Sequence, residues 1–272
     1  MKYGISLCSY ETTFGPIMLK QGSLEEKIKI ASELNYDGID LFSHNMSTEE
    51  ALNTNKLLDK YNIEVAMFIP FFLAELKLSF GDLNDTDRER FIEEYKKQIN
   101  IAEILGAKVM PIGFIRGNLC DDDTLSSYKK RLANSLQTIS SYAKEHNVTL
   151  CLEPINSNEV NTFYHCRQAY DYINEFNLDY MMLLLDTYHI HYEYVSQTEA
   201  IEYCKSRIGH YHLSDSHRLP LGEGSVDFNS VFKKLNNIGY TGYASIESRP
   251  SSTEYAAAKT SIENIKKIQG GL

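Results

Sequence analysis

Acidic residues and a histidine stand at the carboxyl ends of four apolar segments in the second half of the chain. Glu153 ends Thr-Leu-Cys-Leu-Glu, Asp186 ends Leu-Leu-Leu-Asp, His212 lies in Gly-His-Tyr-His-Leu, and Glu247 ends Tyr-Ala-Ser-Ile-Glu. Three carboxylates and an imidazole that converge in a partly enclosed pocket repel and desolvate one another unless a cation lies between them. The set predicts one divalent metal ion, and its oxygen-rich donors favour Mn²⁺, Mg²⁺ or Co²⁺ over a thiolate-type zinc site.

A regular alternation of elements would bring these residues together. Short, β-rich apolar runs occupy residues 3–8, 38–42, 63–69, 108–112, 149–153, 181–186, 208–213 and 243–247. Helical stretches follow them near 24–35, 48–61, 87–105, 123–146, 167–176, 198–205, 228–238 and 252–268. Strands that alternate with helices through short loops are parallel and joined by right-handed crossovers. Since side chains alternate in direction along a strand, the four residues can all point inward at one rim.

The length fits a closed arrangement of these units. The chain has 272 residues, close to the roughly 250 of a typical (β/α)8 barrel, in which functional groups come from the carboxyl ends of the strands. No low-complexity linker or shift in composition marks a boundary. We therefore predict an α/β protein with a single (β/α)8 TIM barrel over residues 1–272. A doubly wound open sheet is the alternative, but no G-x-G-x-x-G follows the first run.

Three helices carry the same start signal in the sequence. Residues 23–26, 47–50 and 251–254 each have the pattern of a capping box, with Ser at the first position and Glu at the fourth. Asp227 is placed to cap a further helix that begins at residue 228.

The overall charge narrows the classes of partner. The chain has 27 Lys and Arg against 37 Asp and Glu, a net charge of −10. An acidic surface repels phosphate backbones and anionic lipids, so we expect neither nucleic acid nor a membrane as partner. The five cysteines are widely spaced with no C-x-x-C pair, and no run approaches the ~18 apolar residues of a membrane span. We expect a soluble, cytoplasmic protein with reduced thiols.

Five ordered motifs carry a family resemblance. They are Leu-Glu-Pro-Ile-Asn at 152–156, Leu-Asp-Thr-Tyr-His at 185–189, His-Tyr-His-Leu-Ser-Asp-Ser-His-Arg at 210–218, Gly-Glu-Gly-Ser-Val-Asp-Phe at 222–228 and Ser-Ile-Glu at 245–247. In order and separation the chain resembles the xylose-isomerase-like barrel superfamily. Within that superfamily it is most similar to the ketose 3-epimerase branch, the D-tagatose/D-psicose 3-epimerase type. The first half matches in organisation more than in signature.

The resemblance implies a role for each site residue. Glu153, Asp186, His212 and Glu247 would bind the metal, with Mn²⁺ foremost, and Glu153 and Glu247 would exchange protons on opposite faces of a ketose. The oxygens at the metal-bound end of the sugar would be held by His189 and Arg218, and its hydroxyls would contact Glu159.

Elementary chemistry supports this division of labour. Removing a proton next to a carbonyl group is hard because negative charge develops on the oxygen, which a metal stabilises as a Lewis acid. A carboxylate that removes the proton and a second that returns it from the far side together invert the carbon. Return to the neighbouring carbon would instead isomerise the sugar. General-base help of this kind typically contributes ~10²–10⁴ in rate. Because Asp227 would compete with a phosphate for the same helix donors, we expect an unphosphorylated sugar.

Secondary positions receive weaker expectations. His210 is expected to be a hydrogen-bonded core residue, and His191 a surface residue. Asp40 stands near the end of the second run, where similar enzymes more often have Glu. An aromatic wall is expected from Tyr10, Phe14, Phe68, Phe71, Phe72 and Phe163.

Other functions share these motifs. An inosose dehydratase or isomerase, or a hydroxypyruvate isomerase, would use the same site chemistry. An abasic-site endonuclease would need additional histidines, which Phe68–Pro70 and Met110–Ile112 do not supply, and it suits the charge of −10 poorly. A non-catalytic sugar-binding protein would have little use for both glutamates. A homo-oligomer remains open.

Overall fold

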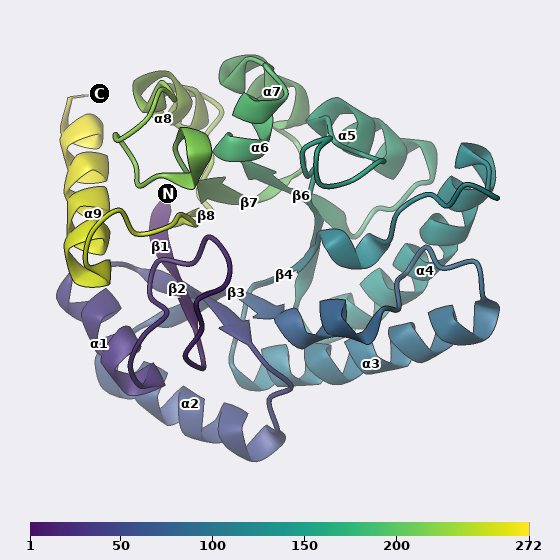
Figure 1. Cartoon of the computed structure of the whole chain (residues 1–272), viewed down its shortest axis with the longest axis horizontal. Coiled ribbons are helices and arrows are strands. Elements are labelled where there is room, and N and C mark those ends of the chain that lie inside the picture. Colours follow the sequence, from purple (N-terminus) through teal and green to yellow (C-terminus); the bar gives the residue numbers. More distant parts are fainter. Residues whose placement is uncertain (272) are drawn as a thin grey trace.

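The computed structural model describes residues 1–271, and in that range eight parallel strands form one closed barrel in chain order. Figure 1 looks onto this ring of strands, with helices around its outside. The strands are β1 (Lys2–Cys8), β2 (Gly38–Ser43), β3 (Glu64–Pro70), β4 (Val109–Ile112), β5 (Thr149–Leu152), β6 (Met181–Asp186), β7 (Ile208–Leu213) and β8 (Tyr243–Ile246). The predicted (β/α)8 barrel is confirmed.

The helices lie close to their predicted ranges. They are α1 (Leu24–Glu33), α2 (Thr48–Tyr61), α3 (Asp85–Ile104), α4 (Leu125–Glu145), α5 (Cys166–Glu175), α6 (Thr187–Tyr192), α7 (Gln197–Cys204), α8 (Phe228–Asn237) and α9 (Glu254–Gly270). Short 3₁₀ turns follow three strands: η1 (Phe71–Leu76), η2 (Phe114–Arg116) and η3 (Ser216–Arg218). Helix α6 was not predicted, because its six residues directly continue strand β6 and are too few to show a helical period.

The helix starts confirm two of the three expected capping boxes. Ser23 and Ser47 each accept a hydrogen bond from the backbone of the glutamate three residues on, and that glutamate bonds back. The box at Ser251 was wrong. Thr253 caps helix α9, and the Glu254 carboxylate instead accepts hydrogen bonds from the backbone of Lys20 and Gln21. Asp227 caps α8 as expected.

The barrel interior is divided between an apolar and a polar side. Met67, Val109, Cys151 and Leu184, from β3 to β6, form one buried cluster. On the side of β1, β2, β7 and β8 the buried residues that face the axis are polar: Ser6, Asp40, His210 and Ser245. The larger core lies between the strands and the helices. The functional side chains therefore stand on a scaffold that is rigid from both sides.

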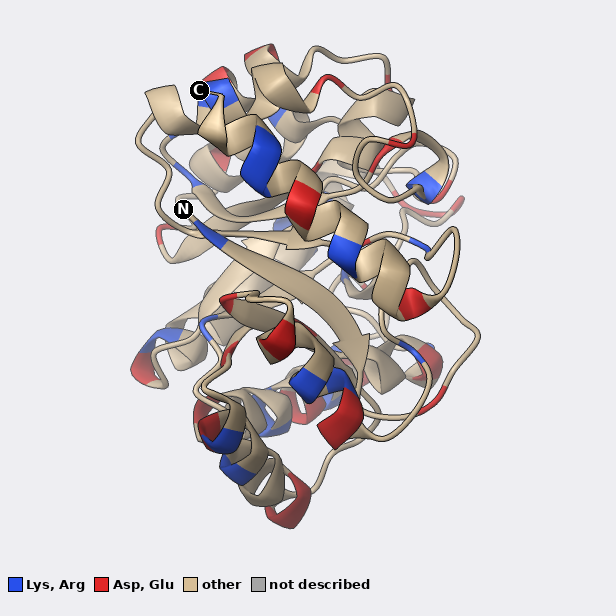
Figure 2. Ribbon diagram, turned by 90° about the vertical axis from the view of Figure 1, so that its left-hand side faces the viewer, with Lys and Arg blue, Asp and Glu red and all other residues tan. Residues whose placement is uncertain are grey.

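Charge is confined to the outside of the ring. Lys, Arg, Asp and Glu colour the surrounding helices, whereas strand β1 beyond its first residues is uncharged (Figure 2). Among residues 1–271, no helix combines the length and apolar character that crossing a bilayer requires.

Candidate active site

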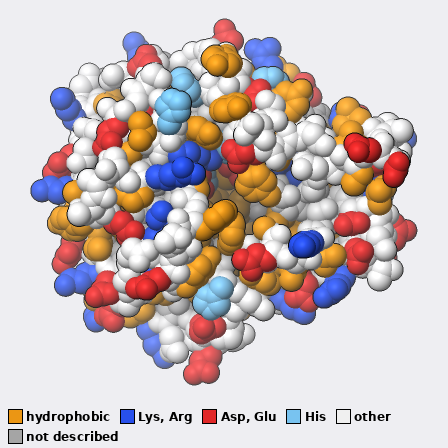
Figure 3. All heavy atoms as spheres, viewed as in Figure 1, with side chains coloured by type: hydrophobic (Ala, Val, Ile, Leu, Met, Phe, Trp, Pro, Cys, Tyr) orange, Lys and Arg blue, Asp and Glu red, His pale blue; other side chains and the backbone are white. Residues whose placement is uncertain are grey.

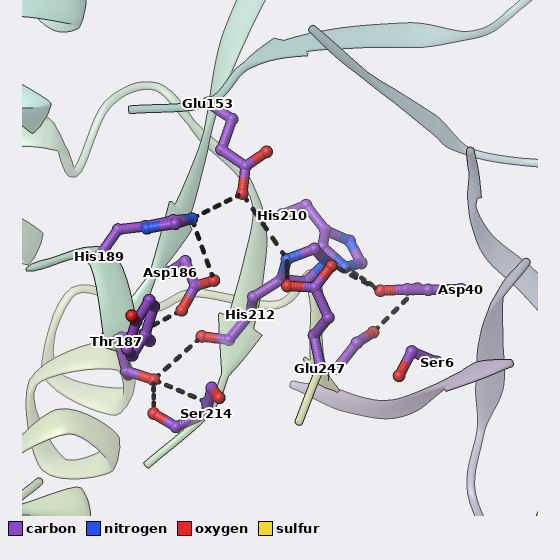
Figure 4. Close-up of polar contacts among 12 residues, drawn as sticks. Ser6, Asp40, Glu153, Asp186, Thr187, His189, His210, His212, Ser214 and Glu247 are labelled. Carbon is purple, nitrogen blue, oxygen red and sulfur yellow. Dashed lines mark hydrogen bonds and ion pairs between the residues drawn. The ribbon is translucent and has the colours of Figure 1, made fainter. Parts of the chain in front are cut away.

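The four predicted metal ligands meet at the carboxyl ends of β5 to β8. One atom each from Glu153, Asp186 and His212 can be chosen so that all lie within 4.8 Å of one another. His212 Nδ1 lies 4.0 Å from Glu153 Oε1 and 3.4 Å from Glu247 Oε2 (Figure 4). Glu153 and Glu247 each follow the last residue of their strand, a position one residue beyond the predicted run. All four side chains are largely buried.

The orientation of His212 fits a cation. Its Nε2 lies 3.1 Å from Asp40 Oδ2, so that nitrogen is committed to the barrel interior. Its Nδ1 is buried with no hydrogen-bond partner among the described residues, and it faces the carboxylates. A metal-binding histidine commonly donates its second N–H to a carboxylate in this way. One nitrogen and three carboxylates are therefore placed to hold a divalent ion.

The electrostatics of the cluster support the same reading. Burial, and then the nearby Glu247 carboxylate, raise the pKa of Glu153 to about 8. Burial also raises the pKa of Asp186, although the Arg218 charge opposes it. Burial opposes the charge of His212, but Glu247 and Asp40 outweigh it and raise the pKa of His212 well above its ordinary value. Without a cation the cluster holds protons in its place, so binding a metal ion releases them.

Arg218 reaches into this cluster from the turn η3. Its Nη1 donates to Asp186 Oδ2 and, at 3.0 Å, to Glu247 Oε2, while its guanidinium lies over the Tyr188 ring at 4.3 Å. Arg218 has a φ of 60°, a left-handed conformation that is uncommon outside glycine. Asp215 holds this loop by accepting from three backbone N–H groups. A strained residue kept in place by its loop is typical of a functional site.

His189 extends the site from helix α6. Its Nδ1 lies 2.8 Å from Asn156 Nδ2 and accepts from the backbone N–H of Asn156, which places the proton of a neutral imidazole on Nε2. That Nε2 lies 3.9 Å from Glu153 and 3.8 Å from Asp186. Burial and then the Arg218 charge lower the pKa of His189 well below its ordinary value, so the ring is neutral. It is placed to donate a hydrogen bond into the space above the carboxylates.

A cavity of about 800 Å³ opens above these residues. Its floor includes Glu153, His189, His212, Arg218 and Glu247, and the predicted Glu159 is exposed at its side, where it accepts from Asn156 Nδ2 at 2.6 Å. The hollow centre of this face is rimmed by apolar and basic side chains (Figure 3). The apolar wall contains Phe14, Ile17, Phe42, Ile69, Phe71 and Phe114.

The expected aromatic wall was only partly right. Phe14 and Phe71 line the cavity, and their ring centroids lie 5.2 Å apart. Phe68 and Phe163 are instead packed in the core between barrel and helices. Phe42 and Phe114 were missed, although each stands near a predicted strand end, which is the signal that would have found them.

Asp40 lies deeper than expected. It stands in the middle of β2, not near its end, and contacts both His210 and His212 through one oxygen. His210 is confirmed as a hydrogen-bonded core residue, fully buried against that carboxylate. His191 lies at the surface side of α6 and is partly exposed, near Ser225.

The fold and the site define a class of protein: a (β/α)8 barrel with a carboxylate–histidine cluster beneath a cavity at the carboxyl ends of its strands. The family described as xylose isomerase-like TIM barrel matches residues 28–268. The chain belongs to this family, as the sequence motifs predicted.

Individual relatives are epimerases and isomerases by name. The chain is 30% identical over 155 residues to a D-psicose 3-epimerase of Enterocloster bolteae, a match that covers 56% of this chain and 50% of that protein. It is 29% identical over 191 residues to an L-ribulose 3-epimerase of Mesorhizobium japonicum, covering 67% and 63%. The chain thus spans about half to two thirds of the length of these two relatives. An inosose isomerase of Bacillus velezensis is 24% identical over 274 residues, covering 94% and 93%.

Solved structures share the architecture. An L-ribulose 3-epimerase superposes with a TM-score of 0.84 at 22% identity, covering 98% of this chain and 94% of the other. A D-psicose 3-epimerase crystallised in the presence of D-fructose gives a TM-score of 0.83 at 16% identity, covering 99% and 100%. At these identities the likeness shows the fold alone.

Proposed function

We propose that the chain is a carbohydrate epimerase or isomerase that requires a divalent metal ion, with manganese foremost, and acts on a free ketose. The observation that carries the proposal is the pair Glu153 and Glu247, which approach His212 Nδ1 from β5 and β8 within one largely buried cluster. The names of the relatives, D-psicose and L-ribulose 3-epimerases, support the same class of reaction.

The reaction requires a proton to leave a carbon next to a carbonyl group. A divalent cation held by Glu153, Asp186, His212 and Glu247 supplies the Lewis-acid stabilisation for the negative charge that develops on oxygen. One of the two glutamates removes the proton. The other returns a proton to the opposite face of the same carbon, which inverts its configuration.

Neighbouring residues orient the sugar for this transfer. The neutral His189 donates from Nε2, and the Arg218 guanidinium donates toward the same space, so both suit oxygens at the reacting end of the sugar. Glu159 stands further out, where it accepts from hydroxyl groups. The wall that includes Phe14, Phe42 and Phe71 limits access of water to the developing charge.

An inosose isomerase or dehydratase is the second candidate. The match to the Bacillus velezensis inosose isomerase covers 93% of that protein, more than either 3-epimerase match, although at lower identity. The two candidates differ in the bond formed after proton removal, so the product separates them. A C3 epimer of the ketose identifies the first, and a shifted carbonyl group or loss of water identifies the second.

The test is proton exchange in D₂O with Mn²⁺, using D-fructose, D-tagatose, D-psicose, L-ribulose and inososes. We expect deuterium at C3 of a ketose together with its C3 epimer. Glu153→Gln and Glu247→Gln should each abolish turnover, whereas Glu175→Gln, on the outside of α5, should leave it unchanged.

Several outcomes would contradict the proposal. Turnover retained in both glutamate variants would remove the two-carboxylate mechanism. Metal binding without exchange into any sugar would favour a non-catalytic binding protein. Salt-sensitive cleavage of abasic duplex DNA would instead indicate an endonuclease.

A further inference from the structure

Asp40 connects the cation cluster to the interior of the barrel. Its carboxylate is fully buried, and its Oδ2 lies 2.9 Å from His210 Nε2 and 3.1 Å from His212 Nε2. Its other oxygen, Oδ1, accepts a hydrogen bond from Ser245 Oγ at 3.0 Å. Figure 4 shows Asp40 on the far side of His212 from Glu153, so the imidazole lies between the two carboxylates.

The surrounding strands are arranged to accommodate this carboxylate. The pairing of β2 with β3 shifts its register between Ile39 and Asp40. Gly4 of β1 stands opposite Ser245, and a Cβ at Gly4 would lie 2.2 Å from Ser245 Oγ. A glycine is therefore needed for Ser245 to reach Asp40. A buried carboxylate is costly unless its oxygens are satisfied, and three donors from two further strands satisfy this one.

Of these three donors, only His212 leads to the cavity. The second ring nitrogen of His210, Nδ1, is buried with no hydrogen-bond partner among the described residues, and His210 does not line the cavity. The second ring nitrogen of His212 faces Glu153 and Glu247. His210 and Ser245 therefore fix the carboxylate, and His212 passes its orientation to the site.

We propose that Asp40 is a positioning residue that sets the tautomer and ring orientation of His212. When His212 Nε2–H donates to Asp40, the lone pair of the neutral ring lies on Nδ1 and points at the position between Glu153 and Glu247. A carboxylate that orients a metal-binding histidine also raises its basicity. The inference rests on the cation site of the proposed function, but it assigns Asp40, a residue outside the ligand set, to that site.

The first measurement needs no variant. Protein labelled with ¹⁵N-histidine and loaded with Mg²⁺, a diamagnetic ion, should show His212 with its proton on Nε2 and none on Nδ1. A proton on Nδ1 of His212 in the Mg²⁺-loaded protein would overturn the proposal.

The second measurement is the dissociation constant for Mn²⁺, followed by electron paramagnetic resonance. D40N keeps the size of the side chain but loses its charge, and it should weaken Mn²⁺ binding by about 10- to 100-fold. The matched control is Glu64→Gln, an acid-to-amide change on β3 at the opposite end of the barrel, which should bind Mn²⁺ as the wild type does. In D40N the His212 signals should show loss of the single Nε2–H form.

These outcomes separate two failures. If wild-type protein binds no Mn²⁺, the cation site of the proposed function is wrong. If wild-type protein binds Mn²⁺ and folded D40N binds it equally tightly with an unchanged His212 tautomer, only the role of Asp40 is wrong. Should D40N fail to fold, the tautomer in the wild-type protein still decides the question.

Discussion

At the scale of single residues, Arg218 occupies a position for which a cation must compete. Its guanidinium already donates to Asp186 and Glu247, two of the proposed ligands. Two unit charges 4 Å apart interact by about 4 kcal/mol at an effective dielectric constant of 20, so this positive charge opposes a second one nearby. The same side chain is proposed to hold substrate oxygens. Arg218 therefore links two binding events that its removal should move in opposite directions.

Arg218→Gln is expected to tighten Mn²⁺ binding about tenfold, a part of that Coulomb energy. It should raise KM for the ketose about 10- to 100-fold, because charge-assisted hydrogen bonds contribute about 1.5–3 kcal/mol. Mn²⁺ titration and steady-state kinetics measure the two effects. Arg249→Gln, at another part of the cavity wall, is the control and should leave Mn²⁺ affinity unchanged. Weaker Mn²⁺ binding in Arg218→Gln would contradict the competition.

Gly113 sets the position of Glu153 by having no side chain. A Cβ at Gly113 would lie 2.8 Å from Glu153 Oε2, so Gly113→Ala must push that carboxylate aside. A misplacement of about 1 Å can cost about 10²-fold in rate, and we expect a loss of kcat of that order. The comparison is Gly209→Ala, where the new Cβ would meet Cys151 Sγ at 2.6 Å and Met182 Cβ at 2.8 Å. That variant should lower Tm more than it lowers kcat, and the reverse ranking would contradict the assignment.

At the scale of elements, the sequence predicted which segments form strands and which ends carry the site. The alternation of short apolar runs with helical stretches was enough to place β1 to β8 and to gather Glu153, Asp186, His212 and Glu247 at one rim. The contact of Asp40 with His210 and His212 was not predictable in this way. It joins β2 to β7 across the closed barrel, and a sequence pattern along one strand does not give the register between strands far apart in the chain.

Strands β1, β3 and β8 are also tied together at the amino end of the barrel. Lys2 Nζ and Tyr243 Oη each lie 2.7 Å from Glu64 Oε2. Hydrogen bonds from Lys2 and then Tyr243 hold the pKa of Glu64 below its ordinary value of 4.5. Since the folded-state pKa is the lower one, this contact stabilises the fold above pH 4.5, and the contribution is lost as pH falls through the folded-state pKa.

Glu64→Gln should therefore reduce the free energy of unfolding at pH 7 by less than about 1 kcal/mol, because the pair is half exposed and screened by solvent. The difference from wild type should shrink as pH falls below 4.5. Urea unfolding at several pH values measures it. Glu93→Gln, which breaks an exposed pair within α3, is the control and should cost less at pH 7. A deficit for Glu64→Gln that grows toward low pH would contradict this account.

At the scale of the whole molecule, the division of the barrel interior explains why the site lies where it does. The apolar cluster of Met67, Val109, Cys151 and Leu184 fills one side, while Asp40 and the histidines of β7 occupy the other. The acidic cluster at the rim is thus backed by a polar network that reaches several strands. A cation bound there contacts residues from β5 to β8, which lie far apart in the chain and are brought together only by folding.

An ion that binds this cluster only in the folded state stabilises the fold by mass action. At a concentration 100 times its dissociation constant it adds about 2.7 kcal/mol, which corresponds to a rise in Tm of about 5 °C for a chain of this size. Thermal unfolding with Mn²⁺, and again with a chelator, measures the shift. Asp186→Asn should lose most of it, because it removes a carboxylate from the centre of the cluster, whereas Glu64→Gln should keep it in full. An equal shift in Asp186→Asn would place the bound ion elsewhere on this acidic protein, since the stabilisation would then not depend on the ligands that the barrel assembles.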